Sequence, residues 1–344
     1  MAADGPGGGG AVNTAASHVP VMPDRVRAIL APALGEPGAV LVDATLGRAG
    51  HTRALLGDHP GLTVIGIDAD ATAISESRRL LAAELSRVRL VQATYDQIAT
   101  ILADLGHNSV QGVLFDLGVS SPQLDDPGRG FSYAQDAALD MRMDRSRELT
   151  AAEVVNTYPA DRLARVLRDY GEERFARRIA SAVVRERSRE PIISTLRLAD
   201  IVRNAIPAAA RRTGGNPAKR TFQALRIEVN DELGSLRRAV PAALDAVAVG
   251  GRIVVLSYHS LEDRIVKRAF SDRSTDTTPP GLPVSLPGSR PQFRLLTRGA
   301  ERPGDAELAA NPRAAPARLR AAERVLPGRQ GRSSPTDQHD QAAA

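Results

Sequence analysis

The chain has 344 residues, of which 42% are hydrophobic, so it can bury a substantial core in one large domain or two. It contains no cysteine, which excludes disulfide bonds, thiolate metal sites and a cysteine nucleophile. Its net charge is +5, and its basic residues are almost all arginine, which suits phosphate contacts but is also what a GC-rich genome supplies. No apolar run reaches the roughly 18 residues of a membrane span, and no signal peptide opens the sequence, so we expect a cytoplasmic protein.

The two ends differ in composition from the rest of the chain. Residues 1–17 are rich in glycine and alanine with almost no bulky apolar side chains, and residues 327–344 are mainly small and polar. Segments of this kind bury too little apolar surface to offset the entropy that folding removes. We expect both to be disordered tails.

In the first part of the chain, short apolar runs alternate with helical patterns. The expected strands are 39–43, 62–68, 88–92 and 111–116. The expected helices include 26–30, 51–56, 74–85 and 98–105. Strands that alternate with helices predict a parallel, doubly wound sheet.

From residue 150 to residue 212 the pattern is helical only. Thr150 and Glu153 have the spacing of a capping box, which marks the start of a helix. Amphipathic segments follow at 161–170, 172–189 and 194–206. We interpret this part of the chain as a helical insertion after the fourth strand.

A long helix is expected next. It starts at Asn216 and Pro217 and carries apolar residues at alternating spacings of three and four as far as Val240. Gly250 and Gly251 end this helical region.

The sheet pattern then resumes. Residues 252–257 form a fifth buried strand, and 293–297 and 318–325 are expected to pair as late antiparallel strands. The predicted fold class is therefore α/β, with a sheet that is interrupted by an all-helical domain.

A glycine-bearing turn at 43–51 follows the first strand and opens a helix, which favours a nucleotide-like ligand at the helix N-terminus. Asp68 ends the next strand, where an acid binds ribose hydroxyls in dinucleotide folds. Together they predict an adenosine-containing cofactor, either NAD or S-adenosylmethionine (SAM). The turn lacks the G-x-G-x-x-G spacing of NAD sites, and Asp43 suits an ammonium group better than a pyrophosphate.

The fourth strand ends in Asp116 and continues into a long loop rich in Gly, Pro, Ser and Asp. Ligands of open α/β sheets bind beyond the carboxyl ends of the strands. This loop is therefore a candidate ligand site, although a strand followed by an ordinary surface turn has the same pattern.

Several motifs resemble the RsmH (MraW) family of bacterial rRNA methyltransferases, over about residues 18–324. They are Asp43–His51, Asp116–Asp125, Arg129–Tyr133, Leu139–Asp144, Tyr170–Phe175, Arg220–Arg226 and Ser257–Arg264. The resemblance implies methylation of N4 of a cytidine in the decoding region of 16S rRNA, with SAM as the methyl donor. It also implies that the rRNA is recognised within the small ribosomal subunit, and it leaves the oligomeric state, including a homodimer, open.

The resemblance further implies a Rossmann-like class I SAM-dependent methyltransferase sheet. We expect the methyltransferase domain to comprise 18–130 and 214–326, and the inserted helical substrate-recognition domain to comprise 131–213. The cofactor residues carried over from the family are Ala49, Gly50, His51, Asp68, Tyr95, Asp116 and Gln123. The family usually has glycine where this chain has Ala49, whose methyl group either crowds the cofactor or is tolerated.

The chemistry agrees with the resemblance, because methylation at cytosine C5 normally needs a cysteine adduct and this chain has no cysteine. An exocyclic amine needs no covalent intermediate, only acceptors that aim it, and such positioning lowers a barrier by roughly 7–11 kcal/mol in favourable cases. The candidate acceptors are Asp116, Ser120 and Ser121. His259 is either a proton acceptor or a structural histidine, and we expect no metal at His259, Glu262 and Asp263.

Two groups of residues are candidates for RNA contact. Phe131 and Tyr133 either stack on a flipped cytosine or anchor their loop. The arginine-rich segments 172–189 and 203–212 lie in the insertion, and we expect them to contact RNA. The alternatives are a non-catalytic ribosome-binding protein on a methyltransferase fold and an NAD-dependent oxidoreductase.

Overall fold

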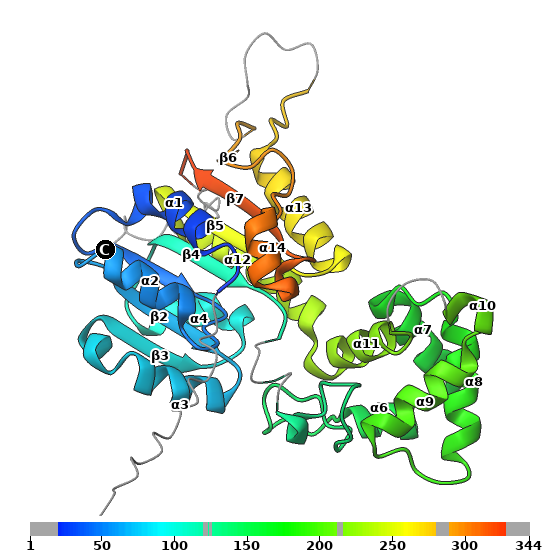
Figure 1. The fold of residues 1–344 in the computed structure, drawn as a ribbon. Helices are drawn as coiled ribbons and strands as arrows, with labels where there is room; N and C mark the ends of the chain where they lie inside the picture. Colours follow the sequence, from blue (N-terminus) through cyan, green and yellow to red (C-terminus); the bar gives the residue numbers. More distant parts are fainter. Residues whose placement is uncertain (1–19, 120–122, 124–125, 212–215, 280–288, 328–344) are drawn as a thin grey trace, which may run out of the picture.

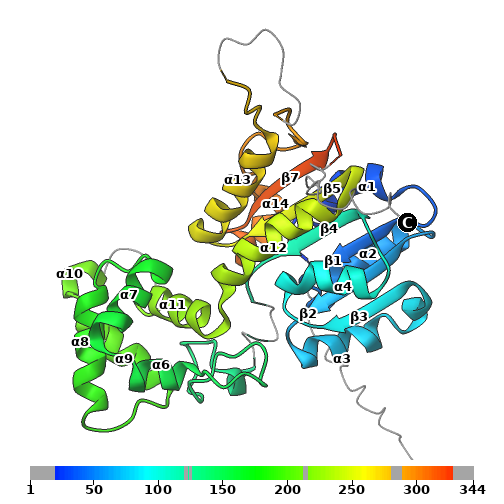
Figure 2. The ribbon, with the colours of Figure 1, turned by 180° about the vertical axis from the view of Figure 1, so that it is seen from behind.

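The computed structural model describes residues 20–119, 123, 126–211, 216–279 and 289–327. The terminal tails expected at 1–17 and beyond residue 327 lie outside this part of the chain. Figures 1 and 2 show a layered α/β body and a helical arm that extends from one side of it.

The body is built on a seven-stranded sheet in the order β3-β2-β1-β4-β5-β7-β6. Its strands are β1 (Val40–Asp43), β2 (Thr63–Asp68), β3 (Val88–Gln92), β4 (Val110–Asp116), β5 (Val247–Ser257), β6 (Phe293–Leu295) and β7 (Arg318–Arg324). The first five strands are parallel, whereas β7 is antiparallel to both β5 and β6. The prediction of two late antiparallel strands is confirmed. This doubly wound sheet with one reversed strand is the Rossmann-like fold of class I methyltransferases.

Helices cover both faces of the sheet because apolar side chains point to both sides of each strand. Leu41 of β1 packs on one side, whereas the next residue, Val42, packs on the other. The first side is covered mainly by α1 (Pro23–Leu34), α2 (Gly50–Asp58) and α3 (Ala71–Leu80). The second side is covered by α4 (Ile98–Asp104), α12 (Glu232–Ala246) and α13 (Ser260–Ser274). A further helix, α14 (Asp305–Ala310), and the 3₁₀ turn η4 (Pro312–Ala314) precede β7.

The arm, called the helical insert below, consists of α6 (Ala151–Thr157), α7 (Ala160–Gly171), α8 (Ala176–Arg187), α9 (Thr195–Ala205), α10 (Ala208–Arg211) and α11 (Lys219–Asn230). The capping box of Thr150 and Glu153 is present at the start of α6. Helices α7 and α11 approach closely at Gly171, where a Cβ atom would lie 2.6 Å from the carbonyl oxygen of Arg220.

Helix α11 also shares the hydrophobic core of the insert. Its buried Phe222, Leu225 and Val229 belong to the same cluster as the buried residues of α6 to α9. The packing therefore favours an insert that continues to Asn230, rather than one that ends at residue 213. The boundaries expected from sequence otherwise stay predictions.

Three element predictions were wrong in detail. The helix expected over 74–85 ends at Leu80 and is followed by a 3₁₀ turn, η1 (Ala82–Arg87). The long helix expected to start at Asn216 begins at Lys219 and breaks at Asp231, whose φ of 51° is left-handed. Gly250 and Gly251 lie inside β5, beside an irregularity in its pairing with β4, and do not end a helical region.

Within the described residues, no helix is both long and apolar enough to cross a membrane.

Candidate cofactor and substrate site

The carboxyl ends of β1, β2 and β4 lie side by side because these strands are parallel neighbours. Each of the three ends in an aspartate, namely Asp43, Asp68 and Asp116. The expected ligand site at this edge of the sheet is therefore built around three carboxyl groups.

Asp43 stabilises the turn that follows β1. Its side chain is only 2% exposed, and its Oδ2 accepts a hydrogen bond from Thr52 Oγ1 at 2.6 Å. Burial raises the pKa of the Asp43 carboxyl group above its ordinary value. With its oxygens directed to Thr52 and to the backbone N–H of Thr45, Asp43 holds the turn against α2.

Ala49 occupies the position where the family resemblance implies glycine. Its φ of 57° is left-handed, a conformation that costs an L-residue roughly 1–2 kcal/mol and that glycine adopts freely. Ala49 is fully buried and belongs to the hydrophobic cluster that contains α1 and α2. The methyl group thus packs in the core, and Gly50 starts α2 directly after it.

Asp68 is held by backbone amides on both sides. Its Oδ2 accepts a hydrogen bond from the N–H of Gly47 at 2.8 Å, and its Oδ1 accepts one from the N–H of Asp70 at 2.9 Å. Burial raises the pKa of Asp68 to about 6, against the opposing effect of these two hydrogen bonds. Asp68 therefore links the glycine turn after β1 to the start of α3.

His51 and Asp116 face each other across the site. His51 Nε2 lies 3.6 Å from Asp116 Oδ2, and the imidazole is 5% exposed. Neither ring nitrogen of His51 has a hydrogen-bond partner among the described residues. Buried polar atoms are nearly always satisfied, so these nitrogens fit a site that receives a polar ligand. A cationic ligand such as SAM also suits the neighbouring carboxylate of Asp116.

Tyr95 lies on the 3₁₀ turn η2 (Tyr95–Gln97) after β3. Its ring packs edge-to-face on Phe115, with 5.8 Å between the ring centroids. Its hydroxyl donates a hydrogen bond to the backbone carbonyl of Glu232 at 3.0 Å. The ring is thus fixed at the edge of the sheet where the resemblance implies a cofactor contact.

Gln123, another expected cofactor contact, is 6% exposed and donates to Asp70 Oδ2 from its Nε2 at 3.1 Å. The same carboxylate oxygen accepts a hydrogen bond from Arg129 Nη1 at 2.7 Å. Asp70 also caps α3 by accepting from the N–H of Thr72. The loop after β4 is therefore tied to the start of α3. Ser120 and Ser121 lie outside the described residues.

Arg129 connects this loop to the helical insert. Its Nη2 donates to the backbone carbonyls of Arg142 and Met143, both at 3.1 Å. The same segment is held from α11 by Asn230, whose amide bonds the carbonyl of Met141 and the N–H of Met143. The sequence predicted no role for Arg129 or Asn230. Arg129 does open one of the family motifs, Arg129–Tyr133, and that motif was the available signal.

His259 caps α13. Its Nδ1 accepts from the N–H of Glu262 at 3.4 Å, and Glu262 in turn accepts from the N–H groups of Tyr258 and His259. Asp263 forms ion pairs with Arg318 and Arg320 of β7. These contacts favour a structural role for His259. A part for His259 in proton transfer stays a prediction.

Phe131 and Tyr133 anchor their loop. Phe131 is 6% exposed within the core of the insert, and Tyr133 packs edge-to-face on Phe222 at 5.6 Å. The suggestion that these rings stack on a flipped cytosine is therefore wrong for the buried Phe131 and disfavoured for Tyr133.

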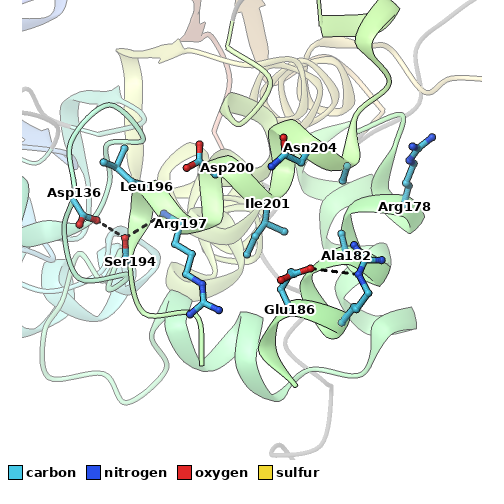
Figure 3. Close-up of a pocket in the computed structure, with 12 residues that line it drawn as sticks. Asp136, Arg178, Ala182, Glu186, Ser194, Leu196, Arg197, Asp200, Ile201 and Asn204 are labelled. Carbon is cyan, nitrogen blue, oxygen red and sulfur yellow. Dashed lines mark hydrogen bonds and ion pairs between the residues drawn. The ribbon is translucent and has the colours of Figure 1, made fainter. Parts of the chain in front are cut away.

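Two hollows open on the insert. One of about 680 Å³ lies between α8 and α9 and is lined by three arginines and three acids, so its charge is balanced (Figure 3). The other, of about 650 Å³, lies between α7 and α8. Its charged lining residues are Arg168, Arg174, Arg177, Arg178, Glu172 and Glu173.

The second hollow is the more basic and lies beside the body. Glu172, one of its lining residues, is bonded to the body, because its Oε2 accepts a hydrogen bond from Ser260 Oγ of α13 at 2.6 Å. Glu173 is 6% exposed and accepts from the N–H of Phe175. Arg177 and Arg178 are exposed and form no ion pair with any described residue.

Proteins of known family match this chain along almost its whole length. A model of the MraW methylase family matches residues 15–325. Ribosomal RNA small subunit methyltransferase H of Thermobifida fusca (strain YX) is 64% identical over 311 residues, which cover 90% of this chain and 94% of that protein. The protein of the same name from Frankia alni is 63% identical and covers 93% of this chain and 98% of its own length. An rRNA methylase structure from Streptococcus thermophilus aligns with a TM-score of 0.40 at 12% identity, over 88% of this chain and 95% of that one.

Proposed function

The chain belongs to the MraW methylase family, and from this premise we propose that it methylates the N4 amino group of a cytidine in the decoding region of 16S rRNA. At the coarser level it is a SAM-dependent methyltransferase of small-subunit ribosomal RNA. The observation that carries the finer proposal is the carboxylate of Asp116 at the end of β4, which is 22% exposed, because it offers a hydrogen-bond acceptor beside the expected cofactor turn.

SAM, when bound, supplies an electrophilic methyl group on a sulfonium. We propose that the turn residues Ala49, Gly50 and His51 and the acid Asp68 hold it, with Tyr95 against the adenine. Two observations support this arrangement: the ring nitrogens of His51 have no hydrogen-bond partner among the described residues, and backbone amides hold Asp68 on both sides. Gln123 completes it from the loop after β4.

The substrate amine needs acceptors for its protons because its lone pair is delocalised into the cytosine ring. We propose that Asp116 accepts one N4–H hydrogen bond and takes that proton as the new N–C bond forms and the methyl–sulfur bond of SAM breaks, with the electron pair passing to sulfur. Ser120 and Ser121 follow on the same loop and stay candidates for the second N–H. No covalent enzyme adduct is needed, in keeping with a chain that lacks cysteine.

The helical insert is proposed to bind the rRNA. Its hollow between α7 and α8 carries two exposed arginines, Arg177 and Arg178, that form no ion pair with any described residue, which suits phosphate groups. The contact of Glu172 with Ser260 sets this hollow close to the start of α13, next to the site. We propose the small subunit, in the cytoplasm, as the particle that it recognises.

The deciding experiment is methyl transfer from labelled SAM to small ribosomal subunits that lack the modification. Nuclease digestion and mass mapping should then locate one added methyl group on N4 of a cytidine. A methyl group on cytosine C5, on a ribose or on another base would contradict the proposal. Absence of any transfer, with SAM bound normally, would favour a non-catalytic ribosome-binding protein. Family membership excludes the NAD-dependent oxidoreductase that the glycine turn alone had allowed.

A further inference from the structure

Tyr258 lies directly after β5 and has no role in the function described so far. Its hydroxyl donates a hydrogen bond to Asp116 Oδ1 at 2.7 Å. The two residues are far apart in sequence, on either side of the insert, and they meet because β4 and β5 are parallel neighbours. This bond connects the two motifs that flank the insert.

The backbone of Tyr258 is fixed on both sides of the residue. Its N–H donates to Glu262 Oε2 at 2.7 Å, and Glu262 is 3% exposed. Two residues earlier, the carbonyl of Leu256 accepts from the N–H of Leu117 at 3.0 Å, which extends the pairing of β4 and β5 past Asp116. The phenol is therefore presented from a rigid element.

The ring of Tyr258 also restrains the start of the loop after β4. Gly118 has a φ of 99°, and a Cβ atom there would lie 3.4 Å from Tyr258 Cδ2. The ring thus packs on the backbone of Gly118, two residues after the carboxylate that its hydroxyl holds.

Asp116 has few other restraints. Its N–H donates to Thr45 Oγ1 at 2.6 Å, which fixes its backbone. Its Oδ2 lies 3.6 Å from His51 Nε2, beyond hydrogen-bond range. Among the described residues, the hydroxyl of Tyr258 thus donates the hydrogen bond that orients the carboxylate, and it occupies Oδ1 while Oδ2 stays available.

We propose that Tyr258 is a positioning residue for methyl transfer, which orients the Asp116 carboxylate so that its Oδ2 faces the substrate amine. The inference rests on the proposed function, since it assumes that Asp116 accepts the amine proton. A fixed acceptor avoids reorganisation in the transition state, so Tyr258 acts on the rate through Asp116 and touches neither substrate nor cofactor.

The test is Tyr258→Phe, which keeps the ring against Gly118 and removes only the hydroxyl. The matched control is Tyr158→Phe in the insert, whose hydroxyl donates to Glu228 Oε1 at 2.8 Å and whose side chain is also largely buried. We expect kcat to fall about 10- to 100-fold in Tyr258→Phe, with the KM for SAM changed less than about threefold. Tyr158→Phe should keep kcat.

The split between kcat and KM separates positioning from a general loss of structure. Tyr258→Phe removes the hydrogen bond donated to the Asp116 carboxylate and keeps the ring, so kcat should fall while the KM for SAM stays nearly unchanged. The other titratable groups that face this pair are His51 from α2, Asp43 from β1, Glu262 from α13 and Glu307 from α14, and the variant leaves all of them in place.

An unchanged kcat, a KM for SAM that rises as much as kcat falls, or an equal loss in Tyr158→Phe would overturn the inference. Mass mapping of the wild-type product separates this failure from failure of the proposed function. If the wild type methylates an atom other than N4, the proposed function is wrong whatever Tyr258→Phe does. If N4 is methylated and Tyr258→Phe behaves as the control does, only the role of Tyr258 is wrong.

Discussion

Arg129 and Asp70 form an ion pair in which both side chains are more than nine-tenths buried, with 2.7 Å between Nη1 and Oδ2. The pair joins the loop after β4 to the start of α3, and the same guanidinium bonds two carbonyls at the base of the insert. Arg129 is therefore placed to hold the loop, the cofactor side of the sheet and the insert together.

Removal of this arginine should be costly. Arg129→Met leaves the carboxylate of Asp70 buried without its cation, and breaking a buried pair in this way costs about 3–5 kcal/mol. Urea unfolding should show this loss in the free energy of unfolding. The control Arg168→Met breaks an exposed pair with Asp169 and should leave the midpoint unchanged. An equal effect of the two substitutions would mean that Arg129 does not hold the loop.

Asp68 should make SAM binding sensitive to pH. Its pKa is raised from an ordinary value of 3.8 to about 6, mainly by burial, and its charged form is the one that accepts ribose hydroxyls. SAM affinity should therefore fall as the pH drops through about 6. Calorimetric titration should show this dependence in the wild type and a weaker, flat affinity in Asp68→Asn.

The same shift sets the sign of a stability effect. Because the folded pKa lies above the unfolded one, the folded protein binds this proton more tightly. The contribution of Asp68 to stability is thus fully present below about 3.8, is lost as the pH rises through about 6, and is constant above that. Asp68→Asn should remove this component from the pH dependence of unfolding.

Gly130 should tolerate no side chain. It has a φ of 71°, and a Cβ atom would lie 2.2 Å from the carbonyl oxygen of Ala138. Left-handed strain and overpacking together predict a loss of about 3–5 kcal/mol for Gly130→Ala. Gly106 has a similar φ of 76° but open space around it, so Gly106→Ala should cost only about 1 kcal/mol. Thermal unfolding of the two variants separates the clash from the backbone strain, and equal losses would exclude the clash.

Charge reversal at Arg177 and Arg178 should weaken binding of small-subunit rRNA. Each phosphate contact that is lost lowers the slope of log K against log salt by about 1, so the double variant should bind less tightly and with a shallower slope. The matched control is charge reversal at Arg78 and Arg79, two consecutive exposed arginines on α3 in the body. Filter binding over a salt series measures both, and equal effects would mean that net charge alone is responsible.

The sequence patterns predicted the strands, their acidic ends and the capping box well, because these features depend on local periodicity and short-range hydrogen bonds. They could not locate the break at Asp231, since the apolar spacing of three and four runs straight through it. Nor could they show that Gly250 and Gly251 lie within β5, because glycine pairs mark turns and strand irregularities alike.

Within the site, the patterns identified residues but not their partners. Asp116, His51 and Asp68 stand at strand ends and turns that signal a ligand site. The pairs Arg129–Asp70 and Tyr258–Asp116 join segments that are distant in the chain. Such contacts depend on the register of neighbouring strands and on the path of the loop. Residue spacing within a short stretch of sequence reveals neither of these.

The placement of the helical insert between β4 and β5 also has a consequence for how the chain folds during synthesis. The insert has its own core, built from helices that are close in sequence, whereas β4 must wait for β5 to emerge before its second edge is paired. Until then β4 presents an open edge, which invites pairing with other chains. We therefore expect chains halted after α11 to protect the insert from protease while β1 to β4 remain cleavable, and the sheet to close only once β5 has left the ribosome.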